Sequence, residues 1–74
     1  MAIVHNRFRY LLDRKRQLEH RRYPLAEVAR LTGLSRPTIH YWYTCKIHQY
    51  NDSTLAPLCD WLNCDIGDIL SVRR

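Results

Sequence analysis

A short segment after Ser35 carries the side chains in this chain that are best suited to reading DNA. The sequence Ser-Arg-Pro-Thr-Ile-His-Tyr places a favourable N-cap before a helix whose outward face would be polar and aromatic. Arginine makes paired hydrogen bonds to guanine, the commonest base-specific contact in the major groove. We therefore expect the first turns of this helix to contact base edges through Arg36, Pro37, Thr38, His40 and Tyr41.

A second set of polar side chains flanks this segment and is suited to the phosphate backbone. Cations and hydroxyls bind phosphate oxygens and orient a protein on the duplex without reading its sequence. The expected phosphate contacts are Ser35, Thr44, Lys46, Tyr50 and Arg22, with Arg21 and Arg30 as weaker candidates. The alternative for several of these residues, Lys46 and His40 among them, is an ordinary solvated surface.

The residues around this segment predict two short helices joined by a tight turn. Pro24 suits the start of a helix over about residues 24–32, and Gly33 suits the left-handed residue that ends it. A second helix is expected over about residues 36–45, with Ile39 and Trp42 on its buried side. Helices joined in this way form a helix-turn-helix, which places its second helix in the major groove of DNA.

The rest of the chain predicts three further helices and no strand. The first would begin near Asn6 and end before Pro24, and residues 45–52 read as a loop. The last two are expected over about residues 53–63 and 66–72. The apolar face of the first helix would hold Val4, Phe8, Leu11, Leu12 and Leu18. The expected fold is therefore one all-α domain over residues 1–74, a compact five-helix bundle without a sheet.

The charge of the chain is unevenly distributed. The net charge is +5, and residues 1–46 hold ten Lys or Arg against three acids. Residues 47–74 hold four acids against two arginines. Because the electropositive part also contains the helix-turn-helix pattern, the distribution favours a polyanionic partner over a merely solvated face.

Other kinds of chemistry have little support. Cys45, Cys59 and Cys64 are odd in number and contain no CxxC, so neither a disulfide framework nor a metal site is expected. No Gly-rich phosphate loop, carboxylate pair or nucleophile with a spaced His is apparent, so the protein is not expected to be an enzyme or to need a cofactor.

A membrane location is not expected either. No apolar run approaches the roughly 20 residues that a membrane span needs. The first ten residues lack the apolar core of a secretory signal. The expected location is the cytoplasm, on the nucleoid when bound to DNA.

Two segments together resemble the Cro/repressor-type, or XRE, family of helix-turn-helix regulators. They are VARLTGLSRPTI and the tail STLAPLCDWLNCDIGDIL, at a suitable distance from each other. The resemblance implies a lambda-repressor-like fold and a sequence-specific repressor that binds a pseudo-palindromic operator as a homodimer. Pro24 and Leu25 depart from the family pattern at the start of the second helix, where a Ser or Thr cap and a Gln are usual.

The expected dimer surface is the C-terminal part of the chain, although core packing would explain much of the same apolar pattern. It would hold Trp61, Ile66, Ile69 and Val72. Three alternatives to the repressor remain open. They are an antitoxin that also binds a toxin protein, a protein-interaction module that has lost DNA binding, and a MerR-type winged helix. The last would need wing strands after the recognition helix.

Overall fold

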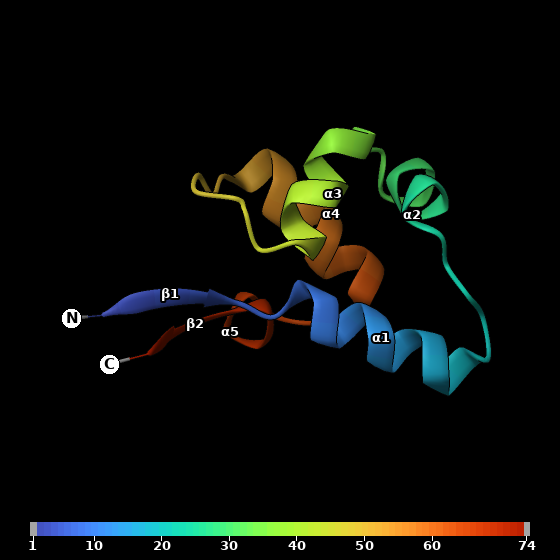
Figure 1. The fold of residues 1–74 in the computed structure, drawn as a ribbon, viewed down its shortest axis with the longest axis horizontal. Helices are drawn as coiled ribbons and strands as arrows, with labels where there is room; N and C mark the ends of the chain where they lie inside the picture. Colours follow the sequence, from blue (N-terminus) through green and yellow to red (C-terminus); the bar gives the residue numbers. More distant parts are fainter. Residues whose placement is uncertain (1, 74) are drawn as a thin grey trace.

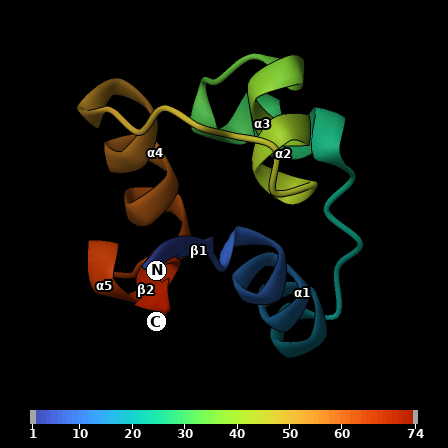
Figure 2. The same ribbon diagram turned by 60° about the vertical axis from the view of Figure 1, so that its left-hand side comes forward.

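The computed structural model describes residues 2–73, which form five helices and a two-stranded antiparallel sheet (Figure 1). The elements in order are β1 (Ile3–Asn6), α1 (Phe8–Glu19), α2 (Leu25–Thr32), α3 (Arg36–Tyr43), α4 (Asp52–Leu62), α5 (Ile66–Ile69) and β2 (Leu70–Arg73). The prediction of five helices is confirmed. Figure 1 shows the ribbon of β1 and β2 projecting beyond the helices, and Figure 2 shows it between α1 and α5.

The sheet contradicts the prediction of a fold without strands. Its register pairs Ile3 with Arg73 and Val4 with Val72, so it joins the two ends of the chain. The last helix was expected to reach residue 72, but it ends at Ile69 and the chain continues as β2. Four-residue strands carry too little alternation to reveal themselves, and their pairing is not local.

The ends of the helices follow from individual residues. Ser35 Oγ accepts a hydrogen bond from Thr38 N at 3.3 Å at the start of α3. Asn51 Oδ1 accepts from Thr54 N at 3.2 Å at the start of α4, so Asn51 is the cap of that helix. Gly33 ends α2 with φ of 76°, as expected of a left-handed residue.

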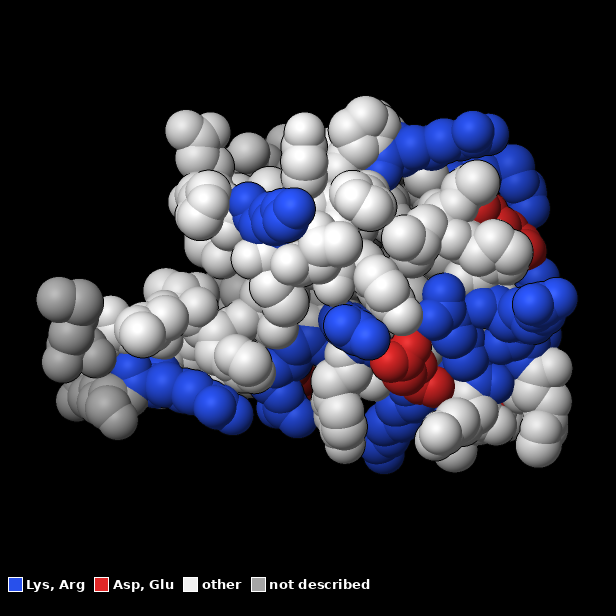
Figure 3. Space-filling view, viewed as in Figure 1, with Lys and Arg blue, Asp and Glu red and all other residues white. Residues whose placement is uncertain are grey.

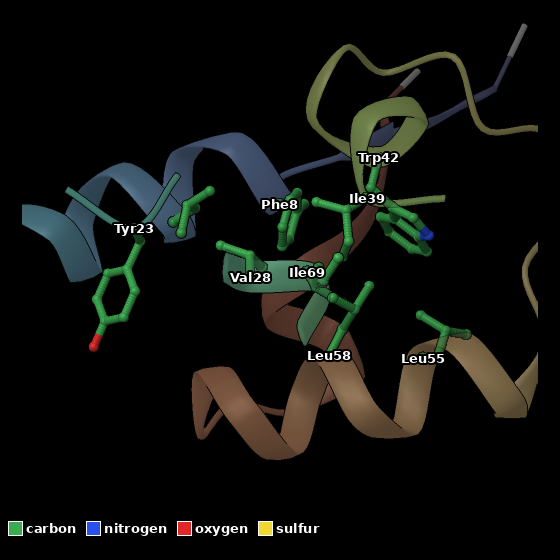
Figure 4. Close-up of a cluster of buried hydrophobic side chains, with 10 residues drawn as sticks. Phe8, Tyr23, Val28, Ile39, Trp42, Leu55, Leu58 and Ile69 are labelled. Atoms are coloured by element: carbon green, nitrogen blue, oxygen red, sulfur yellow. The ribbon is translucent and has the colours of Figure 1, made fainter. Parts of the chain in front are cut away.

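The core lies where all five helices meet, and Val28 of α2 is among its fully buried residues (Figure 4). Ile39 and Trp42 are fully buried, which confirms the predicted inner face of α3. The Trp42 ring packs edge-on against Phe8, with ring centroids 6.3 Å apart. Ile69 is also fully buried, so it is a core residue and not part of a dimer surface.

Two residues expected on the inner face of α1 lie elsewhere. Leu18 is 70% exposed near the end of the helix, and Val4 is half exposed in β1. Helical periodicity predicts the direction in which a side chain points, but not how far along the helix other elements pack against that face. The inner face of α1 therefore extends only over its first turns.

Asn6 ties the start of α1 to the end of α3. Its side chain is nearly buried, and Oδ1 accepts from Phe8 N at 2.8 Å. The N-cap of α1 is Arg7, one residue later than the expected Asn6. Its Nδ2 donates to the carbonyl oxygen of Trp42 at 2.9 Å. This side chain thus links the end of α3 to the start of α1.

Candidate nucleic-acid interface

The outward face of α3 holds most of the predicted base contacts. Because each residue of a helix turns by about 100°, Arg36, Pro37, His40 and Tyr41 lie on the side opposite the buried Ile39 and Trp42. All four are exposed. The rings of His40 and Tyr41 lie edge-on, with centroids 6.4 Å apart. The face therefore presents a cation, an imidazole and a phenol over two turns of helix.

Thr38 lies on the flank of this face and is half-buried. Its hydroxyl is 2.7 Å from that of Ser35, and its backbone N–H donates to Ser35 Oγ. When Thr38 donates in this pair, the Ser35 proton stays available to a phosphate oxygen. The structure thus places Ser35 as a cap that can bind phosphate, and Thr38 as its support.

Two predicted phosphate contacts already use their hydroxyl protons inside the protein. Thr44 Oγ1 donates to the carbonyl of His40 at 2.8 Å, and Tyr50 Oη donates to the carbonyl of Ile47 at 3.2 Å. The Tyr50 ring also packs against Trp42. Because phosphate oxygens only accept, either hydroxyl would have to break this bond to bind one. Their present roles are structural.

Lys46 and Arg22 are better placed to bind phosphate. Both are exposed, and neither forms an ion pair within residues 2–73. Lys46 follows α3 directly, and its backbone N–H donates to the carbonyl of Tyr41 at 2.9 Å. Arg22 and Pro24 line the same surface hollow, at the start of α2.

The sequence prediction missed the open N-terminus of α2. Its N-cap residue is Pro24, and no side chain caps it among the described residues. The first backbone N–H groups of a helix have no partner within it and bind anions well. The sequence indicates this open end through Pro24, because a proline side chain has no hydrogen-bond acceptor with which to cap the helix. A phosphate bound at this end of α2 would also lie near Arg22, which lines the same hollow as Pro24.

Arg21 and Arg30 are engaged with an acid near the same end of α2. Arg21 Nη2 lies 2.5 Å from Glu27 Oε1, and Arg30 Nη2 lies 3.8 Å from the same oxygen. The pair offsets the negative charge of Glu27 in the first turn of α2. Both arginines therefore remain weaker phosphate candidates than Arg22.

A cluster on Tyr43 holds α3 against α1. The guanidinium groups of Arg9 and Arg16 lie over the Tyr43 ring, with their Cζ atoms 5.2 Å and 5.5 Å from the ring centroid. Tyr43 Oη accepts from Arg16 Nη1 at 3.2 Å, and the same guanidinium forms a 2.9 Å ion pair with Asp13. The sequence prediction missed this cluster. Its signal was the spacing of Arg9, Asp13 and Arg16 on one face of α1.

The segment that carries Arg22 is held by a second cluster. Arg16 Nη2 donates to the carbonyl of Tyr23 at 2.8 Å, and the buried Tyr23 ring packs edge-on against Trp61. The Tyr23 hydroxyl donates to Glu19. Hydrogen bonds from Lys15 and then from Tyr23 lower the pKa of Glu19, and the bond to Glu19 raises the pKa of Tyr23.

On the face that Figure 3 shows, Lys and Arg are densest over α1, α2 and the segment between them. Asp60, Asp65 and Asp68 surround a hollow at the turn from α4 to α5. Asp68 also lines a second hollow with Arg7, Arg14 and Lys15. The acids of the C-terminal half therefore border the positive surface on the side of α1. No helix of residues 2–73 is long and apolar enough to cross a bilayer.

The cysteines are free, and the described residues contain no group of His, Cys, Asp or Glu that could hold a metal.

Burial, followed by the nearby Cys59 thiol, raises the pKa of Cys64 to about 11. At pH 8 this leaves about 100-fold less thiolate than an ordinary thiol has. We expect iodoacetamide to modify the exposed Cys45 at least about 10-fold faster than Cys64, because only the thiolate attacks. Timed alkylation followed by mass spectrometry measures both rates, and equal rates would contradict the prediction.

A family model described as a Cro/C1-type HTH DNA-binding domain matches residues 15–73. The match contains α2, the turn at Gly33, α3 and the helical tail of α4 and α5. The comparisons with curated proteins and with solved structures gave no match. Since the match covers well over half of the chain, this protein belongs to the family of Cro/C1-type helix-turn-helix DNA-binding domains.

Proposed function

We propose that this DNA-binding transcriptional regulator is a repressor that binds a pseudo-palindromic operator as a homodimer, with α3 in the major groove. One observation carries the proposal. On the outward face of α3, the side chains of Arg36 and His40 form no hydrogen bond or ion pair within residues 2–73. The inner face of the helix is anchored by the buried Trp42, whose carbonyl accepts from Asn6. An exposed polar face on a firmly held helix is what reading of base edges requires.

The residues divide into base contacts and phosphate contacts. Arg36 would bind guanine, Pro37 would contact a thymine methyl group, and His40 with Tyr41 would reach further along the groove. Thr38 supports the N-cap instead of reading a base. The phosphates would be bound by Ser35, Lys46, Arg22 and the open N-terminus of α2.

The direct test is selection of bound fragments from genomic DNA by the purified protein. We expect an enriched motif with two related half-sites about one helical turn apart, because a two-fold dimer presents two copies of α3. A transcription assay with and without the protein then separates repression from activation. Absence of enrichment at any salt concentration would contradict sequence-specific binding.

Lys46→Ala is expected to weaken binding to the operator and to random DNA by similar factors. The loss of one phosphate contact should also make the slope of log K against log salt concentration about 0.9 less steep. Fluorescence anisotropy over a salt series measures both effects. Arg73→Ala is the control, because it removes an exposed cation on β2, outside the proposed interface. An unchanged slope in Lys46→Ala would remove Lys46 from the interface.

A protein partner is the second candidate function, as for an antitoxin or an interaction module. Tyr10 and Leu18 are exposed on α1 and line the same surface hollow, and Leu18 lies opposite the face that contacts Tyr43. The surface at Leu18 is away from α3, so it could bind a protein while DNA is bound. Lack of DNA binding in a gel shift at low salt would favour the interaction module. The winged-helix alternative is wrong, because α3 is followed by a loop and α4 and not by wing strands.

A further inference from the structure

The outer edge of β1 carries unpaired backbone groups. Arg7 N donates to the carbonyl of Ile69 at 2.8 Å, which extends the ladder of β1 and β2 by one pair. Hydrogen-bonded pairs alternate in an antiparallel ladder, so the N–H and C=O of Ile3 and His5 point toward β2 and those of Val4 point away. The carbonyl of Asn6, which also points away, accepts from the Cys45 thiol at 3.8 Å. The backbone of Val4 has no such partner within residues 2–73.

The ribbon also exposes apolar side chains without charge on β1. Ile3 is 64% exposed, Val4 49% and Val72 57%. Val4 and Val72 lie on the same face of the ribbon as Asn6 and Leu70, which are buried and half-buried near the helices. This face extends beyond the helices at Val4 and Val72. A two-stranded ribbon is marginal alone and needs further cover. Residues 2–6 contain no Lys, Arg, Asp or Glu in a chain of net charge +5, so two copies can approach here without repulsion.

We propose that β1 pairs antiparallel with β1 of a second copy of the chain, across a two-fold axis at Val4. The register follows from the edge: Val4 faces Val4 of the second copy, and each donates its N–H to the other's carbonyl. Ile3 then lies opposite His5 of the second copy. The result is one four-stranded sheet through the dimer. This inference rests on the proposed homodimer and gives it a surface that the C-terminal prediction did not include.

Pairing through β1 fits better than pairing through β2 for two reasons. β2 ends in Arg73, so a symmetric pair of β2 strands would bring like charges together. In Figures 1 and 2, β1 lies between β2 and the half of the molecule formed by α2, α3 and α4. A second copy at the β1 edge would therefore lie on the side of α3, where an operator with two half-sites needs it.

The test compares two proline variants of the full chain, Val4→Pro and Val72→Pro. Each removes one N–H that points outward, on opposite edges of the ribbon, and spares the bonds between β1 and β2. We expect wild type and Val72→Pro to sediment as dimers of the 8.9 kDa chain. Val4→Pro should raise the dimer dissociation constant about 10- to 100-fold, because both bonds of the symmetric pair are lost.

Circular dichroism establishes first that each variant keeps its helices. A wild-type monomer up to about 100 μM, well above the range of a useful dimer, would overturn the inference. Equal weakening by the two variants, or weakening by Val72→Pro alone, would overturn it as well. Sedimentation is measured without DNA, so a monomer that still selects an operator would refute the β1 interface and leave DNA binding intact.

Discussion

Replacing Arg36 by alanine is expected to weaken binding to the selected operator by about 5- to 150-fold, with much less effect on random DNA. A bidentate contact to guanine contributes about 1–3 kcal/mol of discrimination, and about 1.4 kcal/mol is a factor of ten. Arg36 is exposed at the first position of α3 and forms no ion pair within the described residues. The alanine variant therefore loses a base contact without losing an internal one. Anisotropy titrations with operator and scrambled DNA, at one salt concentration, measure the effect.

Two further variants separate charge from geometry at this position. Arg36→Lys keeps the charge but not the planar fork, so it should retain binding to random DNA while losing most of the operator preference. Arg73→Ala removes an exposed arginine on β2, far along the chain from α3, and should leave the preference unchanged. If Arg36→Ala binds the operator as tightly as the wild type does, the assignment of α3 as the recognition helix is wrong.

Asn6→Ala is expected to lower the free energy of unfolding by about 1–3 kcal/mol. It removes the side-chain acceptor of Phe8 N, which contributes about 1 kcal/mol, and a buried hydrogen bond to the carbonyl of Trp42, which contributes about as much. In a domain of this size each kcal/mol lowers Tm by about 4–8 °C. Thermal unfolding followed by circular dichroism measures the shift.

The matched control for Asn6 is Asn51. Asn51→Ala also removes the side-chain acceptor of a backbone N–H, here of Thr54, but the Asn51 side chain is exposed and makes no bond to another element. Its cost should be that of a cap alone, and the difference between the variants measures the bond that joins α1 to α3. If the two variants are equally destabilised, that bond contributes nothing and α3 is positioned by Trp42 and Tyr43 alone.

Much of the helical framework could be predicted, because it depends on neighbours in the chain. Gly33 and Ser35 mark the ends of α2 and α3 through their own backbone and side-chain preferences. The spacing of Ile39 and Trp42 identified the inner face of α3, and hence the outer face that carries Arg36. The family resemblance rested on the same local features, and the family match agrees with it.

The sequence did not reveal which polar groups are already paired. A hydroxyl such as that of Thr44 or Tyr50 looks available in the sequence, but in the folded protein it donates to a carbonyl three or four residues earlier in the chain. Tyr43, the last residue of α3, joins that helix to the cations of α1 through a partner that lies far from it in the sequence. Spacing along the chain cannot distinguish a free polar group from a paired one.

The local pattern of residues was thus enough to identify the helix-turn-helix and the side of α3 that faces outward, because helical period and capping act within a few residues. Folding in three dimensions settled the ribbon, which joins Val4 to Val72 across nearly the whole chain. It also settled the burial of Ile69, which moved one expected dimer contact into the core. Both depend on contacts that form only when distant segments meet, so no short stretch of sequence contains them.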